Sequence, residues 1–240
     1  MDASADHSEP SAFRRHWRVV TVAGLLGMTY FRCCLIGAPR TKFLKELGAT
    51  ERHFGIIASL AAVTMAFQLV SGALANRLRQ RKPLWMTLFV LHRLTFIGVL
   101  CAPGLFASST ARIWWIIGVL LVHNSLIHLG DPLWFSWMTD LVPEKGFSEH
   151  WGRRQRFITV GGIFTQVAIA FWFGWYENQG RVVEGFIIIG IFGIILGVID
   201  IFLFTMVPEP PHHREEGLPL RQALAEPFRN PQFRPFLIYQ

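Results

Sequence analysis

Long apolar runs alternate with short polar segments along most of the chain. Runs of about 18 or more residues with few charges are typical of helices that cross a membrane. Because these runs are too long and too continuously apolar for barrel strands, they predict an all-α membrane protein built as a bundle of transmembrane helices. We expect six spans, at approximately residues 17–39, 54–75, 84–104, 113–139, 157–175 and 183–207.

The segments that flank this six-span domain, residues 17–207, are polar. Residues 1–16 form an N-terminal tail. Residues 208–234 form a loop that opens with the Pro-rich stretch PEPPHHREEG, which is typical of a flexible linker. Residues 235–240 begin a seventh apolar run. A last span that starts where the sequence stops suggests a fragment of a longer membrane protein.

Composition supports the membrane setting. The 240 residues are 52% hydrophobic and 16% charged, whereas globular chains average about 25% charged. Cys33, Cys34 and Cys101 fall in predicted spans and have neither disulfide-framework nor zinc-site spacing, so we expect no metal and no cofactor. The sequence also lacks the P-loop, GxSxG and HExxH motifs, which argues against an ATP-driven pump and an intramembrane hydrolase. We therefore expect no enzyme activity.

The distribution of positive charge predicts the orientation. Fifteen of the 23 Lys and Arg residues lie on the N-terminal tail, the second-to-third and fourth-to-fifth connections and the final tail, and six lie on the other side. Cytoplasmic loops carry an excess of Lys and Arg, so we expect the N-terminus in the cytoplasm and the protein in the cytoplasmic (inner) membrane. The net charge of +7 then reflects topology and attraction to anionic lipid rather than nucleic-acid binding.

Two of these basic connections contain spaced motifs. The second-to-third connection reads GALANRLRQRKP, and the fourth-to-fifth reads TDLVPEKGFSEHWGRRQRF. Their motif residues are Gly72, Asn76, Arg77, Arg81 and Lys82 in the first, and Asp140, Pro143, Gly146, Arg153 and Arg154 in the second. These spacings resemble the cytoplasmic loops of the major facilitator superfamily. Asn76 stands where that family usually has aspartate, and Arg79 where it usually has glycine.

The resemblance covers essentially the whole chain, as the family's N-terminal six-helix half with two inverted three-helix repeats. It implies a secondary transporter that moves a small solute by alternating access, as a fragment of a twelve-span carrier whose C-terminal half is missing. Sugars, organic anions and peptides fit as solutes, and protons are a further candidate partner, as in a symporter. The alternative is a six-helix membrane enzyme or a non-transporting membrane interaction protein.

Charges at the predicted inner helix ends suggest a gate. Arg77 and Arg81 lie at the inner end of the second span, and Asp140 lies at that of the fourth. A pair between Asp140 and one of the two arginines would tie the helix ends together in one conformation and release them in the other. We expect this pair and the other motif residues to act at a cytoplasmic gate.

Polar residues inside the spans are candidates for the substrate cavity, because an ionised side chain at membrane depth costs about 2.5–3.5 kcal/mol on insertion scales. Asn124, His128 and Asp131 fall within an arc of roughly 60° on the fourth span, with Asp131 about 27 Å from its outer end. We expect Asp131 to line a cavity or gate, or else to accept hydrogen bonds in a structural role. His128 beside it is a candidate proton carrier.

Arg32, Gln68 and Gln166 complete the candidate cavity residues. The resemblance implies that spans one, two, four and five line the cavity, while three and six support them. Arg32, about 10 Å from the outer end of the first span, is a candidate to bind an anionic or polyhydroxyl solute. Its alternative is to extend toward the outer headgroups. The charged or titratable residues of the supporting spans are assigned structural roles: His92, Arg93 and Asp200.

Overall fold

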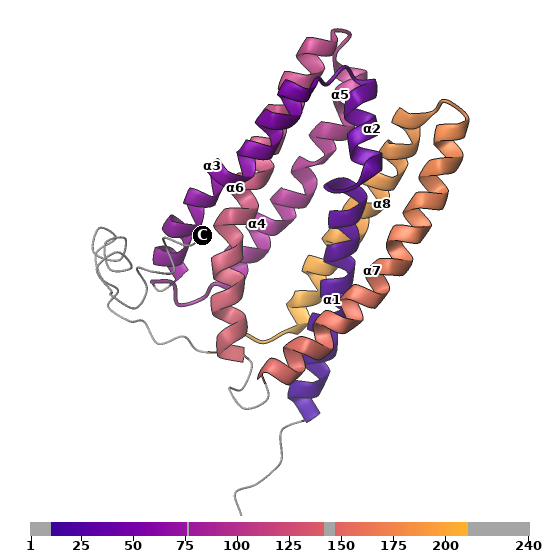
Figure 1. The fold of residues 1–240 in the computed structure, drawn as a ribbon. Coiled ribbons are helices and arrows are strands. Elements are labelled where there is room, and N and C mark those ends of the chain that lie inside the picture. The colour runs from indigo at the N-terminus through magenta and orange to yellow at the C-terminus, as the bar shows by residue number, and fades with distance from the viewer. Residues whose placement is uncertain (1–10, 76, 142–146, 211–240) are drawn as a thin grey trace, which may run out of the picture. The chain divides into compact units, whose positions relative to one another are not determined.

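The computed structural model describes residues 11–75, 77–141 and 147–210, which are helical except in short connections (Figure 1). The elements are α1 (Ser11–Cys34), α2 (Ala38–Glu46), α3 (Glu51–Ala75), α4 (Lys82–Thr95), α5 (Ile97–Leu105), α6 (Ser109–Leu141), α7 (Phe147–Asn178), α8 (Val182–Leu203) and the short 3-10 helix η1 (Phe204–Met206).

Within the described residues, six helical segments are long and apolar enough to cross a membrane. They are His16–Glu46, Glu51–Ala75, Lys82–Leu105, Ser109–Leu141, Ser148–Asn178 and Val182–Met206. The predicted fold class, an all-α protein with six such helices, is therefore confirmed. The exact membrane limits and the inverted repeats stay predictions, and the expected seventh span at 235–240 lies outside the described residues.

Two of the expected spans are divided. Where a single first span was expected, α1 ends at Cys34 and α2 begins at Ala38. Gly37 between them has a φ of +89°, a left-handed conformation that glycine adopts without steric cost. Arg40 Nη1 closes the turn by donating to the Leu35 carbonyl at 2.8 Å. The third span is likewise divided at Phe96, between α4 and α5.

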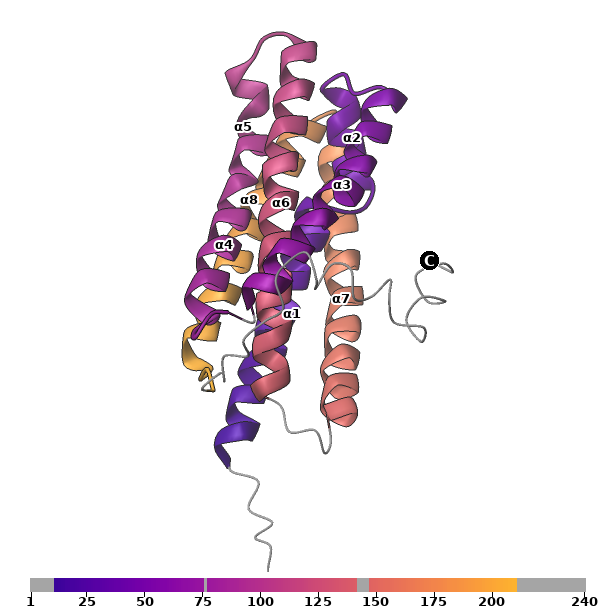
Figure 2. The same cartoon turned by 90° about the vertical axis from the view of Figure 1, so that its left-hand side faces the viewer.

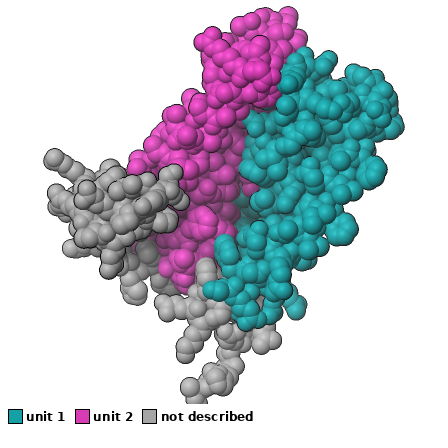
Figure 3. Space-filling model, viewed as in Figure 1, with its two compact units in different colours: residues 1–46, 144–208 teal, residues 47–143, 209–240 magenta. Residues whose placement is uncertain are grey.

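The chain forms two compact units (Figure 3). Unit 1 comprises Met1–Glu46 and Glu144–Pro208, and therefore contains α1, α2, α7 and α8. Unit 2 comprises Leu47–Pro143 and Glu209–Gln240, and contains α3 to α6. Unit 1 thus joins the first helices of the chain to the last, although more than ninety residues separate them in the sequence.

In unit 1, α1 packs against both α7 and α8, and α2 packs against α8. One close approach is at Gly193 of α8, which lies against Cys33 and Cys34 of α1. At the far end of α1, the ring of Phe43 in α2 stacks on Phe186 of α8, with 4.4 Å between the ring centroids. Small residues and one aromatic stack therefore hold these three helices together.

In unit 2, α6 is the central helix and contacts α3, α4 and α5. Both views show α4 and α6 running side by side (Figures 1 and 2). Trp85 of α4 meets Trp137 of α6 with 5.7 Å between ring centroids, and Phe89 of α4 lies against Gly130 of α6. Because Gly130 has no side chain, α4 comes close to α6 just before Asp131.

The contact at Gly193 gives a test of the packing in unit 1. A methyl group there would come within 2.6 Å of Cys33 Cβ, so α1 and α8 would have to move apart. We expect Gly193→Ala to lower the free energy of unfolding by about 1–3 kcal/mol, seen as a lower melting temperature in detergent. The control is Gly174→Ala in α7, where no described atom lies within 4 Å of the added carbon. Equal melting temperatures for the two variants would contradict this packing.

Candidate functional site

Arg81 is the centre of a charged network at the end of unit 2 where α4 begins and α6 ends. Its guanidinium is fully buried. It donates from Nη2 to Asp140 Oδ2 and from Nη1 to Ser136 Oγ, at 2.6 Å in each case. Glu209 Oε1 accepts from the backbone N–H of Arg81 at 2.5 Å and from that of Lys82 at 3.2 Å. We call Arg81, Ser136, Asp140 and Glu209 the Arg81 network.

Asp140 and Glu209 stabilise different parts of the Arg81 network. A buried guanidinium loses its hydration, and charge-assisted hydrogen bonds to Asp140 offset part of that loss. The first N–H groups of α4 have no partner inside the helix, and the positive end of the helix dipole favours a carboxylate there. Glu209 fills this position. Removing Asp140 therefore takes a charged acceptor away from the buried guanidinium of Arg81.

The Arg81 network contains one of the two pairs predicted for Asp140. Asp140 is paired with Arg81, one of the two arginines considered. The ammonium of Lys82 lies 5.5 Å from the centroid of the Trp137 ring. The sequence analysis missed the contacts of Glu209, because it treated the Pro-rich segment as a flexible linker. A carboxylate held between two prolines directly after the sixth apolar run was the available signal.

A second group lies in the middle of the helices of unit 2. The Gln68 side-chain amide nitrogen in α3 lies 2.9 Å from His128 Nδ1 in α6. An amide nitrogen only donates, so this contact makes Nδ1 the acceptor and places the proton of a neutral ring on Nε2. One turn further along α3, the Ser71 hydroxyl donates to the Leu129 carbonyl. Polar side chains therefore join α3 to α6 at this depth.

Asp131 lies three residues after His128 and is half-buried. The buried guanidinium of Arg93 in α4 attracts its carboxylate. Arg93 is about 16 Å along α4 from Lys82, and Asp131 is about 15 Å along α6 from Leu141. The two charges therefore lie at nearly the same depth. The sequence analysis gave Arg93 a structural role and did not predict its attraction to Asp131. The similar depths of the two residues could have indicated it.

We call Gln68, Arg93, His128 and Asp131 the mid-helix cluster. Two buried histidines extend this cluster. His92 of α4 and His123 of α6 have ring centroids 3.8 Å apart, and His92 Nδ1 lies 3.0 Å from the His123 carbonyl oxygen. Asn124 follows His123 and is half-buried, one turn before His128. The structure thus places three of the predicted cavity residues of α6 along one part of the helix and brings one of them, His128, against Gln68.

The remaining cavity candidates, Arg32 and Gln166, lie in unit 1 on the seam between α1 and α7. The Arg32 guanidinium lies against Gly162 of α7, and its Nη1 donates to the Met28 carbonyl at 3.4 Å. The Gln166 amide nitrogen lies one turn further along α7, beside Gly37. Because Gly162 has no side chain, it leaves room for a guanidinium inside the seam. Arg32 and Gln166 are therefore half-buried polar side chains on this seam.

The other motif residues have varied surroundings. Gly72 lies in α3, and no described atom is within 4 Å of the position that a Cβ would take. Arg153 pairs with Glu149 at 2.6 Å, and Arg154 lies 5.0 Å from the centroid of the Trp151 ring. Asn76, Pro143 and Gly146 lie outside the described residues. Within the parts of the chain that are described, no group of three or more His, Cys, Asp or Glu side chains is placed to hold a metal ion.

Comparison with known families agrees with this arrangement. The family model described as Major Facilitator Superfamily matches residues 20–239, which is most of the chain. A search of curated proteins gave no match, and a search of solved structures gave none either. Proteins of this superfamily carry small solutes across membranes. With six apolar helices and a match over almost its whole length, the chain belongs to the major facilitator superfamily and is a multi-pass membrane transporter.

Proposed function

We propose that this chain forms the N-terminal six-helix half of a secondary carrier, which moves a small polar solute across the cytoplasmic membrane by alternating access. The observation that carries the proposal is the mid-helix cluster. Charged side chains at membrane depth are costly and usually face a wet cavity or each other. A transporter needs such a site near the middle of its helices, and a purely structural bundle does not. The excess of Lys and Arg on one set of connections supports an N-terminus in the cytoplasm.

Three residues are proposed to bind the solute. The guanidinium of Arg32 offers a planar fork of donors that suits a carboxylate or a pair of hydroxyl groups. Gln166 on the same seam adds a neutral donor and acceptor, and Asn124 on α6 is a separate candidate in unit 2. Organic anions and sugars are therefore the solute classes proposed. The second, C-terminal half of a twelve-span carrier would supply the remaining wall of the cavity.

Proton coupling is proposed for His128 and Asp131. The neutral His128 ring accepts from the Gln68 amide through Nδ1. Protonation turns Nδ1 into a donor, so Gln68 must rotate its amide to present oxygen or the contact breaks. Protonation of Asp131 removes its attraction to Arg93. One bound proton therefore changes the contacts of α6 with α3 or α4, which is the kind of change that shifts a two-state equilibrium.

The Arg81 network is proposed as the cytoplasmic gate. It ties the start of α4 to the end of α6 through the buried guanidinium of Arg81. In a carrier that rocks about a central site, contacts at one end of the helices hold in one conformation and break in the other. The cost of leaving Arg81 buried without Asp140 makes the change between the two conformations abrupt.

The proton-coupling proposal predicts a specific defect in Asp131→Asn. A gradient of one pH unit is worth about 1.4 kcal/mol per proton, so one-to-one coupling supports about tenfold solute accumulation. With the full-length carrier in proteoliposomes and a panel of labelled sugars and organic acids, we expect the wild type to reach that ratio. With Asp131→Asn, the solute should only reach equal concentrations on both sides, because the asparagine side chain cannot take up the proton.

Solute exchange at equal pH on both sides supplies the control for this experiment. It needs no net proton movement, so Asp131→Asn should retain it. Glu184→Gln, which removes an exposed carboxylate on α8, should behave as wild type. Tenfold accumulation by Asp131→Asn would refute coupling through this carboxylate. Failure of every panel member to exchange in the wild-type carrier would refute the proposed solute classes.

The gate proposal predicts that Asp140→Asn opens the end of unit 2 where α4 begins. The variant loses a charge-assisted hydrogen bond to a buried guanidinium, worth about 1–3 kcal/mol. Hydrogen–deuterium exchange at the first amides of α4 should therefore become faster. The exchanged pair Arg81→Asp with Asp140→Arg should restore part of the protection. Arg79→Gln, an exposed arginine in the same connection, is the matched control. Unchanged exchange in Asp140→Asn would rule out the gate.

A further inference from the structure

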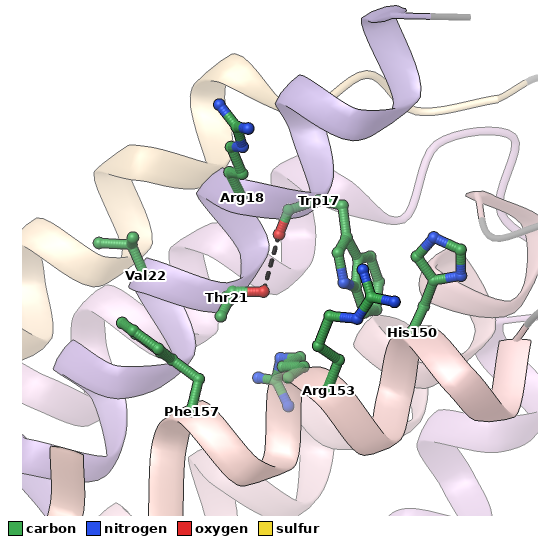
Figure 4. Close-up of a pocket in the computed structure, with 8 residues that line it drawn as sticks. Trp17, Arg18, Thr21, Val22, His150, Arg153 and Phe157 are labelled. Carbon is green, nitrogen blue, oxygen red and sulfur yellow. Dashed lines mark hydrogen bonds between the residues drawn. The ribbon is translucent and has the colours of Figure 1, made fainter. Parts of the chain in front are cut away.

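A pocket of about 780 Å³ lies between the N-terminal parts of α1 and α7 in unit 1 (Figure 4). Its lining residues are Trp17, Arg18, Thr21 and Val22 from α1, and His150, Arg153, Arg154 and Phe157 from α7. It belongs to neither the Arg81 network nor the mid-helix cluster. We propose that this pocket binds the headgroup of a single anionic phospholipid, whose acyl chains lie along α7.

The charge of the pocket favours an anion. Three of its lining side chains are guanidinium groups, and none of the eight described lining residues is acidic. Glu149 pairs with Arg153 at 2.6 Å, and the two side chains are 66% and 68% exposed. Such an exposed pair contributes little free energy. A phosphate can therefore replace Glu149 as the partner of Arg153, and its oxygens suit the guanidinium fork.

Arg154 is already held in place beside the pocket. Its Nε donates to the Val20 carbonyl at 3.5 Å, and its guanidinium lies 5.0 Å from the centroid of the Trp151 ring and against Gly24. Asp200 of α8 also attracts this guanidinium. A ligand that reaches Arg154 therefore meets a group that is positioned in advance, so little side-chain freedom is lost on binding.

The pocket is polar at one end and apolar at the other. Figure 4 shows Arg153 and His150 gathered around Trp17 at one end, and Val22 with Phe157 at the other. Trp17 has an apolar ring system with one N–H, which is the type of side chain found at membrane–water interfaces. This arrangement matches a headgroup joined to hydrocarbon, and it does not match a small ion such as inorganic phosphate.

The depth of the pocket matches that of lipid headgroups. The apolar run of α1 begins at about residue 17, and that of α7 at about residue 157. The lining residues lie within about 11 Å of those points along the helices. Both helices begin at this end, and the N–H groups in the first turn of α7 add partial positive charge there. The phosphate of a lipid in the same leaflet lies at this level of the membrane.

The surface of α7 continues the apolar end of the pocket. Six large apolar side chains, each 49% to 79% exposed, follow at spacings of three or four residues: Phe157, Val160, Phe164, Val167, Phe171 and Trp175. At 100° per residue they share an arc of about 100° with His150 and Arg153. One face of α7 therefore carries first the basic groups and then an exposed apolar stripe, in the order in which a phospholipid presents its phosphate and chains.

The test uses the full-length protein, delipidated in detergent and titrated with phosphatidylglycerol or phosphatidylcholine under native mass spectrometry. We expect one phosphatidylglycerol to bind at least about tenfold more tightly than phosphatidylcholine. Removing two guanidinium groups in Arg153→Gln/Arg154→Gln should weaken phosphatidylglycerol binding by at least about tenfold. The matched control is Arg156→Gln, an exposed arginine on the same helix that does not line the pocket, and it should bind as wild type.

A second variant keeps the test valid if the double variant does not fold. Val22→Trp fills the apolar end of the pocket without removing charge, and it should also release phosphatidylglycerol. Equal binding of the two lipids would overturn the proposal. Equal losses in Arg156→Gln would overturn it as well, because they would show general surface attraction. Displacement of the lipid by soluble glycerol phosphate would assign the pocket to a soluble anion instead.

Discussion

The cost of holding a charge inside a lipid bilayer is the constraint on which this structure depends. Lipid supplies no hydrogen bonds, so the backbone must satisfy its own polar groups, and long helices do so. The same constraint applies to side chains. In unit 2 the buried Arg81 is bonded to Asp140 and Ser136, and the buried Arg93 attracts Asp131. In unit 2, the two buried guanidinium groups of Arg81 and Arg93 therefore each have an opposite charge on α6.

The Arg81–Asp140 and Arg93–Asp131 pairs both connect α4 to α6, at two depths. Arg81 lies at the start of α4 and Arg93 lies near its end. Aromatic contacts between Trp85 and Trp137 fill the space between the two levels. In the proposed mechanism, protonation at the deeper pair and release at the Arg81 network are two changes at one helix interface. Close packing favours two discrete arrangements of such an interface over a continuous slide.

The sequence predicted the helices well, because a membrane span is a local property of composition. It also predicted the pairing of Asp140 with an arginine of the second-to-third connection, because both residues lie at helix ends on the same side. Longer-range relations were not available from one sequence. Nothing in the order of residues says that α1 and α2 pack with α7 and α8, or that Glu209 returns to the start of α4.

Some missed features had a local signal that was not used. Gly37 and Pro39 at the end of the first apolar run were consistent with a break in the helix. The prediction of one span over residues 17–39 used only the apolar character of the run. Arg93 was judged by the helix on which it lies, and its depth was not compared with that of Asp131. The contact of Gln68 with His128, in contrast, depends on how α3 packs on α6, and residue spacing does not determine it.

Alternating access is the central claim, and accessibility from the two sides of the membrane tests it most directly. Asn124 lies about 22 Å from one end of α6 and about 25 Å from the other. In a carrier with Cys101→Ser, whose native thiol is exposed, a membrane-impermeant thiol reagent should label Asn124→Cys from either side. A saturating transported solute should protect it. Labelling from one side only, or from neither, would contradict the account.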